Sequence, residues 1–254
     1  MANEGDGAMR VAIFSDIHAN RPAFEAVLAA ARARHAERII LLGDYVGYGA
    51  DPEWAVDVVS DLVAKGASAI LGNHDRAVRH PSETMNDAAQ IVIAWTRERL
   101  TADRQDFLDR LPLTHIEEGA LYVHAEASDP AAWHYVRSAD DAARSLAATD
   151  ARVTICGHVH RPALYSMSAV GKMTAFVPTK EIPVQLLTGR RWLVVLGSVG
   201  QPRDGIAAAS FAMFDTVRQE ITFCRVPYDI DAAAARIRDN GLPSWFADRL
   251  YLGK

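Results

Sequence analysis

The fold is decided by residues 10–20, which read Arg10-Val-Ala-Ile-Phe-Ser-Asp-Ile-His-Ala-Asn20. The first five residues are rich in β-branched and aromatic side chains and predict a short strand. Asn20 can cap a helix that starts near Pro22, because proline is tolerated in the first helical turn. One face of this helix carries the apolar stripe Phe24, Val27, Leu28 and Ala31. Strand, polar loop and amphipathic helix in this order form the first unit of an α/β fold.

The same order of elements returns along the first part of the chain. Further strands are predicted at residues 38–42, 67–71, 121–123 and 152–156. Helices are predicted from residue 52 onward and at 87–100, 103–111 and 141–148. This spacing is typical of right-handed crossovers in a largely parallel sheet.

From residue 164 the pattern changes to short strands and turns. Apolar runs at 192–196, 210–214 and 221–226 have hairpin-like spacing and predict a second, mixed or antiparallel sheet. Asp229 then caps an alanine-rich helix that ends at Asn240-Gly241. Because the sequence contains no Pro/Gly/Ser linker and no internal repeat, we expect one domain over residues 9–254. Residues 1–8 are expected to be a leader that is not ordered throughout.

The composition argues against several classes of protein. The chain has 27 Lys and Arg against 32 Asp and Glu, a net charge of −5, which argues against a protein that mainly binds nucleic-acid backbones. With only Cys156 and Cys224, a disulfide framework is excluded and a reducing compartment fits. The first residues lack the basic and apolar parts of a signal peptide, and the apolar runs are too short to span a bilayer. We therefore expect a cytoplasmic protein without a membrane partner.

Side chains that bind metals follow the predicted strands with regularity. They form five groups: Asp16-Ile-His18, Gly43-Asp44-Tyr-Val-Gly47, Gly72-Asn73-His74-Asp75, His124, and Gly157-His158-Val-His160. The strand ends of an open α/β sheet face one crevice, so residues that are distant in sequence converge there. The glycines suit sharp turns and allow the backbone to approach a ligand closely.

Each group has an ordinary structural interpretation when it is taken alone. Asp16 and Asp44 can cap the helices that follow them. His18 can lie in a surface loop, Asn73 can shape a turn, and His124 can be a hydrogen-bonded core histidine. Taken together, however, two carboxylates, one amide and four imidazoles form a ligand set with no structural purpose. We therefore favour metal binding.

The types of ligand restrict the metal. Oxygen and imidazole ligands without thiolates favour Mn, Fe, Zn or Ni over a structural zinc site, and make Mg a poorer match. Seven ligands are too many for one tetrahedral ion and suit two ions that share a carboxylate. Two divalent ions bring a formal charge of about +4 against −2 from the carboxylates, so the pocket attracts an anion such as phosphate.

In order and spacing, the five groups resemble the motifs of the calcineurin-like metallophosphoesterase superfamily. The resemblance runs from about Val11 to Gly205, and the segments Gly197–Asp204 and Arg225–Tyr228 resemble its small bacterial phosphodiesterase branch, which includes diadenosine tetraphosphatase-like enzymes. It implies an α/β (α+β-like) fold in which a sandwich of two β-sheets is flanked by helices. It also implies a metal-dependent phosphoric ester hydrolase.

The resemblance implies a role for each motif residue. One ion takes Asp16, His18, Asp44 and His160, and the other takes Asp44, Asn73, His124 and His158. His74 corresponds to the catalytic histidine, and Asp75 to the acid that orients its ring. Two divalent transition-metal ions are implied as cofactors, with Mn or Fe favoured and Zn or Ni possible.

The implied mechanism is attack on phosphorus by a hydroxide that bridges the two ions. His74 then protonates the leaving oxygen or stabilises the phosphoryl group. The substrate is expected to be a small phosphodiester or nucleotide rather than an extended nucleic acid. A phosphomonoesterase or protein phosphatase with the same site, a nuclease for short oligonucleotides, and a non-catalytic metal-binding scaffold stay open as alternatives.

The sequence offers fewer signals for substrate binding. Arg203, with the backbone amides of residues 197–200, and Asn73 are the candidates for binding a phosphate, although Arg203 is nearly as well explained as a solvated turn residue. His134, Tyr135 and Arg137 can line an entrance, but a plain surface segment is the better interpretation. Glu126 and Leu196 depart from the family pattern, and Glu126 is expected at the rim of the pocket.

Overall fold

The computed structural model describes residues 9–81 and 85–254, and in this part of the chain the strands form two six-stranded mixed sheets. We call the first one sheet A. Its strands lie in the order β3 (Ser68–Ala69), β2 (Arg38–Leu41), β1 (Arg10–Phe14), β11 (Ala209–Asp215), β12 (Glu220–Val226) and β9 (Val184–Gln185). Strands β1, β2 and β3 are parallel, whereas β11 pairs antiparallel with β1. The N-terminal and C-terminal parts of the chain therefore share one sheet.

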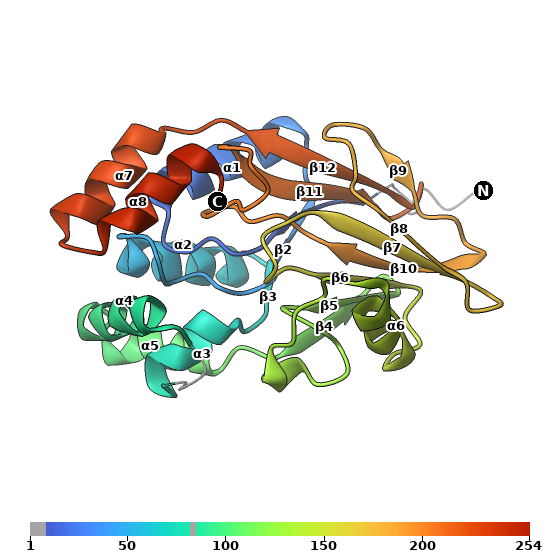
Figure 1. The fold of residues 1–254 in the computed structure, drawn as a ribbon, viewed down its shortest axis with the longest axis horizontal. Coiled ribbons are helices and arrows are strands. Elements are labelled where there is room, and N and C mark those ends of the chain that lie inside the picture. The colour runs from blue at the N-terminus through green and yellow to red at the C-terminus, as the bar shows by residue number, and fades with distance from the viewer. Residues whose placement is uncertain (1–8, 82–84) are drawn as a thin grey trace.

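The second sheet, sheet B, takes its strands from the middle of the chain. Their order is β4 (Thr114–Glu117), β5 (Ala120–Val123), β6 (Val153–Cys156), β10 (Arg190–Val195), β7 (Ala163–Ser168) and β8 (Met173–Phe176). Strands β5, β6 and β10 are parallel to one another, and the outer pairs are antiparallel. The two sheets lie one above the other in Figure 1.

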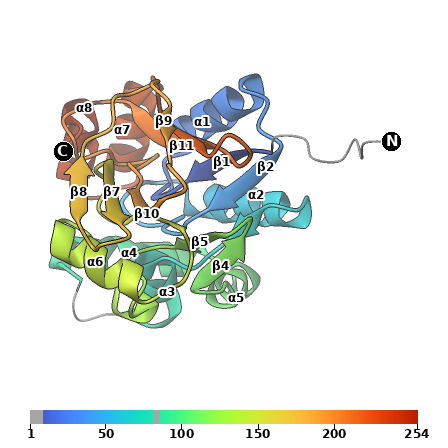
Figure 2. The ribbon, with the colours of Figure 1, turned by 90° about the vertical axis from the view of Figure 1, so that its right-hand side faces the viewer.

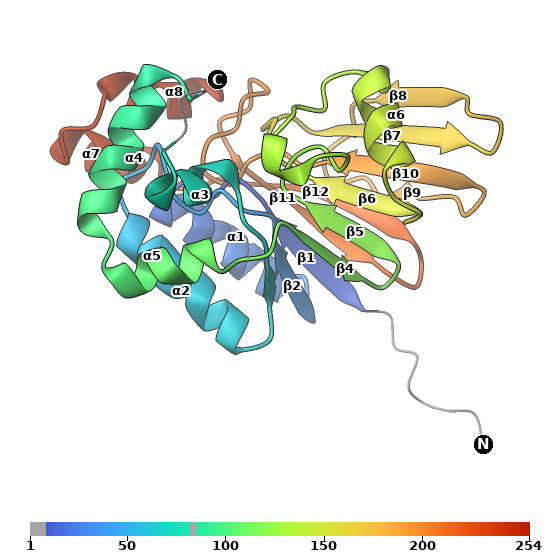
Figure 3. The same ribbon diagram turned by 90° about the horizontal axis from the view of Figure 1, so that it is seen from below.

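Helices cover the outer face of each sheet. Helices α1 (Arg21–Ala33) and α2 (Pro52–Ala64) pack on sheet A, and α6 (Ala139–Ala147) packs on sheet B. Figures 2 and 3 show this layering from the side and from below. The remaining helices are α3 (Asn73–Arg79), α4 (Asp87–Arg99), α5 (Ala102–Asp109), the short 3₁₀ turn η1 (Pro130–Ala132), α7 (Ile230–Asp239) and α8 (Ser244–Leu252).

Alternation along β1 explains why both of its faces are buried. Ala12 and Phe14 face helices α1 and α2, whereas Val11 and Ile13 face sheet B. Successive side chains of a strand point to opposite faces, so one apolar strand supplies two cores. The prediction of two sheets flanked by helices is confirmed.

The predicted division of strands between the sheets was wrong. The run at 192–196 lies in β10 and extends sheet B beside β6, while the runs at 210–214 and 221–226 lie in β11 and β12 and extend sheet A. Hairpin-like spacing correctly identified β11 and β12 as neighbours, but it carries no information about which sheet edge they join. Helix α3, directly after the third strand, was also not predicted.

A polar cluster ties the edges of the two sheets together. Arg38 of sheet A makes two hydrogen bonds of 2.7 Å to the carboxylate of Glu117 in sheet B. Ser68 lies 2.8 Å from Arg38 and 3.1 Å from the Nε2 atom of His115. Such a bidentate, partly buried ion pair is stronger than an exposed one and fixes the relative position of the two edges.

Among the described residues, no helix has both the length and the apolar composition that crossing a bilayer requires.

We expect Ile13→Ala to destabilise the protein by about 2–5 kcal/mol, because it opens a cavity between the two sheets. Ile13 is 0% exposed, whereas Ile116 is 69% exposed, so Ile116→Ala is the matched control and should change stability by less than about 0.5 kcal/mol. Urea denaturation of the metal-free proteins measures both changes. Equal losses in the two variants would contradict the packing described above.

Candidate metal centre

The candidate ligands lie on loops at the carboxyl ends of four strands. Asp16 and His18 follow β1, Asp44 follows β2, His124 follows β5, and His158 and His160 follow β6. The backbone at Asp16, His18, Asp44, His158 and His160 has positive φ values between 50° and 65°. Side chains other than glycine rarely adopt this left-handed conformation, which costs about 1–3 kcal/mol for each residue and occurs preferentially at functional sites. The backbone of these loops is therefore strained, and this conformation places the side chains in the site.

Hydrogen bonds between the loops hold this backbone in place. The amide of Asp16 donates to the carbonyl of Gly43 at 3.1 Å, and the amide of His18 donates to the carbonyl of Asp44 at 2.9 Å. The side chain of Asp16 accepts from the amide of His158 at 3.1 Å. The loops after β1, β2 and β6 thus support one another.

The side chains converge on two adjacent groups of possible metal ligands. One group contains Asp16, His18 and His160, and the other contains Asp44, His124 and His158. Within each group, one ligand atom from every side chain lies within 4.8 Å of the others. His18 and Asp44 form a third such group with His74, so they connect the two main groups.

Three of the four imidazoles are anchored by backbone carbonyl oxygens. The Nδ1 atoms lie 3.1 Å from the carbonyl of Val46 (His18), 2.7 Å from that of Leu42 (His124) and 2.7 Å from that of Gln201 (His160). A carbonyl oxygen only accepts, so each Nδ1 carries the hydrogen and directs the lone pair of Nε2 into the centre. Histidines that bind metals typically have this arrangement.

The atoms that face the centre fit a cation. The Nε2 atoms of His18 and His160 are 3.1 Å apart, and Nε2 of His124 lies 3.2 Å from Nδ1 of His158. Among the described residues, the buried Oδ1 of Asp16 has no hydrogen-bond partner. Lone pairs at these distances repel one another unless a positive charge lies between them. The donor set therefore fits divalent transition-metal ions.

Burial controls the charges of these groups. Burial and the neighbouring His160 lower the pKa of His18, and burial lowers the pKa of His158 to about 3, so both are neutral at pH 7. Burial alone would lower the pKa of His124, but the Asp44 carboxylate raises it to about 9. Burial alone would raise the pKa of Asp44, but His124 and His74 hold it well below the usual range. Neutral imidazole and ionised carboxylate are the forms that bind metals, so His124 has to lose a proton before it can bind an ion.

His74 and Asn73 border the centre from the first turn of α3. The Oδ1 atom of Asn73 lies 3.1 Å from Nε2 of His124. The ring of His74 is buried and lies 4.9 Å from that of His18, and its backbone amide donates to Asp44 at 2.9 Å. Burial lowers the pKa of His74 to about 4.

The family resemblance implied that Asp75 orients the ring of His74, but the structure places Asp75 differently. Its carboxylate accepts hydrogen bonds of 2.7–3.2 Å from four backbone amides, those of Asp44, Tyr45, Val46 and Gly72. Asp75 is the third residue of α3, where a carboxylate turns back toward the free amides at the start of the helix. Asp75 therefore holds the backbone of the Asp44 loop. The Nδ1 atom of His74 has no hydrogen-bond partner among the described residues.

The prediction that the backbone amides of residues 197–200 bind a phosphate is also wrong in part. The amides of Val199 and Gly200 donate to the carbonyls of Ser15 and Asp16 at 3.0 and 2.9 Å, so they support the β1 loop and are not free for a phosphate. Arg203 is half-buried, and its guanidinium donates to Oε1 of Gln201 at 2.7 Å.

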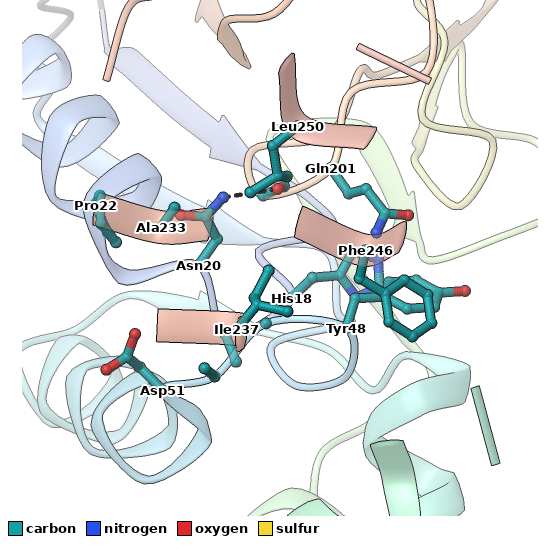
Figure 4. Close-up of a pocket in the computed structure, with 14 residues that line it drawn as sticks. His18, Asn20, Pro22, Tyr48, Asp51, Gln201, Ala233, Ile237, Phe246 and Leu250 are labelled. Carbon is teal, nitrogen blue, oxygen red and sulfur yellow. Dashed lines mark hydrogen bonds between the residues drawn. The ribbon is translucent and has the colours of Figure 1, made fainter. Parts of the chain in front are cut away.

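Tyr48 is a site residue that sequence reasoning missed. Its ring lies 4.5 Å from that of His18 and 4.6 Å from that of His74, and the guanidinium of Arg203 lies 5.5 Å from its centre. Its position directly after Gly43-Asp44-x-x-Gly47 is the only signal for it in the sequence. Figure 4 shows Tyr48 beside Phe246 of helix α8, with His18 nearby, around a small pocket.

A cleft of about 760 Å³ opens outward from the centre. Its lining includes Asn73, His74, Trp133, His134, Tyr135 and His158. His134 and Tyr135 thus belong to the entrance, and Arg137 lies over the ring of Tyr135, whereas the preferred sequence interpretation was a plain surface. Glu126 is not at the rim: it is 0% exposed and accepts from the amide of Ser128 at 3.0 Å.

Gly157→Ala should disturb the centre, because the added Cβ would lie 1.8 Å from Oγ of Ser15 and 2.7 Å from Oδ2 of Asp16. We expect a loss of about 1–3 kcal/mol in unfolding free energy, the usual cost of overpacking, together with weaker Mn²⁺ binding. Urea denaturation and elemental analysis measure the two effects. Gly189→Ala is the control, because nothing lies within 4 Å of its added Cβ; a Gly157→Ala protein equal to this control would show that the loops can move apart freely.

Comparisons with known proteins agree with this geometry. Residues 9–219 match the model of the calcineurin-like phosphoesterase superfamily domain. The chain is 35% identical to the uncharacterized protein MJ0912 of Methanocaldococcus jannaschii, over 96% of this chain and 98% of that protein. It is also 35% identical to a metallophosphoesterase from Sphaerobacter thermophilus, whose crystal structure superposes with a TM-score of 0.86 over 98% of this chain and 100% of the other.

A more distant fold neighbour is a protein proposed to be a diadenosine tetraphosphatase, with 16% identity and a TM-score of 0.51 over 87% of this chain and 96% of the other. At this identity the likeness concerns the fold alone. The family model and the relatives at 35% identity cover most of the chain, and the residues that resemble the family motifs are the ones that the fold brings together. The chain is a member of the calcineurin-like metallophosphoesterase superfamily, whose members are phosphoric ester hydrolases that depend on divalent metal ions.

Proposed function

We propose that the protein is a dinuclear metal-dependent phosphodiesterase that hydrolyses a small phosphodiester or nucleotide. The observation that carries this proposal is the pair of adjacent ligand groups, Asp16/His18/His160 and Asp44/His124/His158. His18 and Asp44 connect the two groups through His74, and His74 and His158 line the cleft. One ion alone would leave half of these buried donors without a partner, which is costly.

The carboxylate and imidazole ligands are assigned from their places in the two groups, and Asn73 from its contact with His124. Asp16, His18 and His160 hold one ion and Asn73, His124 and His158 hold the other, with Asp44 shared between them. Mn or Fe is favoured, and Zn or Ni also suits these ligands. When bound, such ions supply Lewis acidity, which activates water and neutralises charge on the phosphoryl oxygens.

The chain's own residues bind and orient the phosphoester. His74 borders both the centre and the cleft, where a ring N–H can donate to a phosphoryl or leaving-group oxygen. Asn73 can add a side-chain amide beside His124, and Arg203 brings a positive charge near Tyr48. Asp75 acts indirectly, because it holds the backbone of the Asp44 loop.

The cleft supports a small organic substrate. A volume of about 760 Å³ is in the range of small-molecule sites, and the lining mixes apolar side chains, such as Met85 and Trp133, with basic ones, such as Arg76. The net charge of −5 argues against extended nucleic acid.

Two features of the structure support proposals about the number of domains and about the cellular compartment. Strand β1 pairs with β11, so residues from both ends of the chain share sheet A, which supports one domain over residues 9–254. Cys156 and Cys224 are both free and buried, which supports work in a reducing compartment such as the cytoplasm.

Metal analysis combined with an activity assay tests the function. We expect two ions per chain by elemental analysis, and hydrolysis of bis(p-nitrophenyl) phosphate that is lost on chelation and restored by Mn²⁺. Asp44→Asn should bind at most one ion and lose this activity, while Asp61→Asn, on the exposed face of α2, should match the wild type. Faster turnover of p-nitrophenyl phosphate than of the diester would replace the phosphodiesterase by a phosphomonoesterase.

His74→Asn should separate chemistry from metal binding. Because His74 is assigned to the substrate rather than to an ion, we expect turnover to fall by about 10²–10⁴-fold with two ions still bound. The matched control is His35→Asn, since His35 is exposed in the loop after α1. Near-normal turnover in His74→Asn would remove His74 from the mechanism, and loss of metal would make it a ligand.

A further inference from the structure

The four candidate imidazole ligands differ in what fixes their rings. Those of His18, His124 and His160 are each anchored by a hydrogen bond from Nδ1 to a backbone carbonyl. His158 has no such anchor: its Nδ1 faces His124 at 3.2 Å, and its buried Nε2 has no hydrogen-bond partner among the described residues. The side chain is 6% exposed, so bulk water does not replace the missing bond.

Tyr135 takes the place of that anchor by stacking. Its ring centre lies 4.1 Å from that of His158, and the two ring planes are inclined by only 15°. A near-parallel contact at this distance restricts rotation of the imidazole about its χ2 angle, the motion that a hydrogen bond to the second nitrogen normally prevents.

The other face of Tyr135 is occupied as well. The guanidinium carbon of Arg137 lies 3.9 Å from the centre of the Tyr135 ring. At such distances Arg137 and His158 cannot share one face, so the ring lies between them. Although Tyr135 lines the cleft and is 39% exposed, its faces are therefore not open for stacking on a substrate.

The segment that carries Tyr135 is held on both sides. The amide of Glu126 donates to the carbonyl of His134 at 3.1 Å. Val136 is 2% exposed and packs with Ala142 and Leu146 of α6. Because His134 and Val136 are both held in place, the Tyr135 ring between them is a firm support for the imidazole of His158.

We infer that Tyr135 is a positioning residue that holds His158 in place for the ion of the Asp44/His124/His158 group. This inference rests on the proposed two-ion centre, and it makes the two halves of that centre unequal. The imidazoles of the Asp16/His18/His160 half are each anchored by a hydrogen bond to the backbone, whereas His158 in the other half depends on a side chain at the edge of the cleft.

Titration of chelator-treated protein with Mn²⁺, monitored by isothermal titration calorimetry, tests this inference. We expect wild-type protein to bind two ions, and Tyr135→Ala to bind one of them about 10–100-fold more weakly, the usual effect of removing a group that orients a ligand. Tyr135→Phe keeps the ring and should match the wild type within about twofold. Tyr251→Ala, an exposed tyrosine on α8, is the matched control and should bind both ions normally.

A double-mutant cycle with His158→Asn identifies the path of the effect. If Tyr135 acts through His158, then Tyr135→Ala should weaken Mn²⁺ binding no further in the His158→Asn protein. Wild-type affinity for both ions in Tyr135→Ala, with only the KM for the diester raised, would make Tyr135 a substrate contact and overturn the inference. Loss of affinity in Tyr135→Phe would overturn the role of the ring. A wild-type protein that binds fewer than two ions would instead overturn the proposed function on which the inference rests.

Discussion

The burial of the Asp16 and Asp44 carboxylates is the constraint on which the rest of the structure depends. Both side chains are at most 1% exposed, and a buried carboxylate persists in ionised form only where donors or cations surround it. The structure supplies some donors from its own backbone, namely the amides of His158 and His74. The remaining oxygens and the facing imidazoles fit a bound cation. Metal binding is therefore expected to stabilise the folded arrangement of the loops, as is general for sites whose ligands are spread along a chain.

This constraint explains which parts of the structure could be predicted from the sequence. Strands β1, β2, β5 and β6 are short apolar runs directly followed by polar metal-type residues, so local patterns identify both the strands and the convergence of their ends. The division of strands between two sheets could not be predicted, because the choice of a sheet edge for β10, β11 and β12 depends on contacts between distant segments. The role of Asp75 was missed for a related reason. The family resemblance implied that Asp75 orients His74, whereas the third position of α3 directs this carboxylate to the backbone.

The site also shows how aromatic side chains support polar ligands. Tyr48 contacts His18 and His74, Trp133 lies edge-on 5.8 Å from His124, and Tyr135 stacks on His158. Each ring excludes water from an imidazole without adding a charge or a competing acceptor, which strengthens the electrostatic interactions inside. None of the three aromatic residues belongs to the five groups of candidate metal-binding residues by which the sequence identified the site. Composition alone gives no reason to connect them with a metal centre, so geometry had to supply that connection.

The C-terminal helices extend this support beyond the region that the family model covers. The model ends at residue 219, yet Phe246 of α8 lies 5.0 Å from Tyr48 and shares an apolar cluster with Ala89 of α4 and Ala233 of α7. Tyr48 has a left-handed backbone, with φ at 61°, and such a residue keeps its position only if the surroundings hold it firmly. Helices α7 and α8 provide packing for Tyr48, and together with His18 they line the small pocket beside it. The candidate ligands thus follow the motif pattern of the superfamily, while Tyr48 at the edge of the site packs against helices from the last part of this chain.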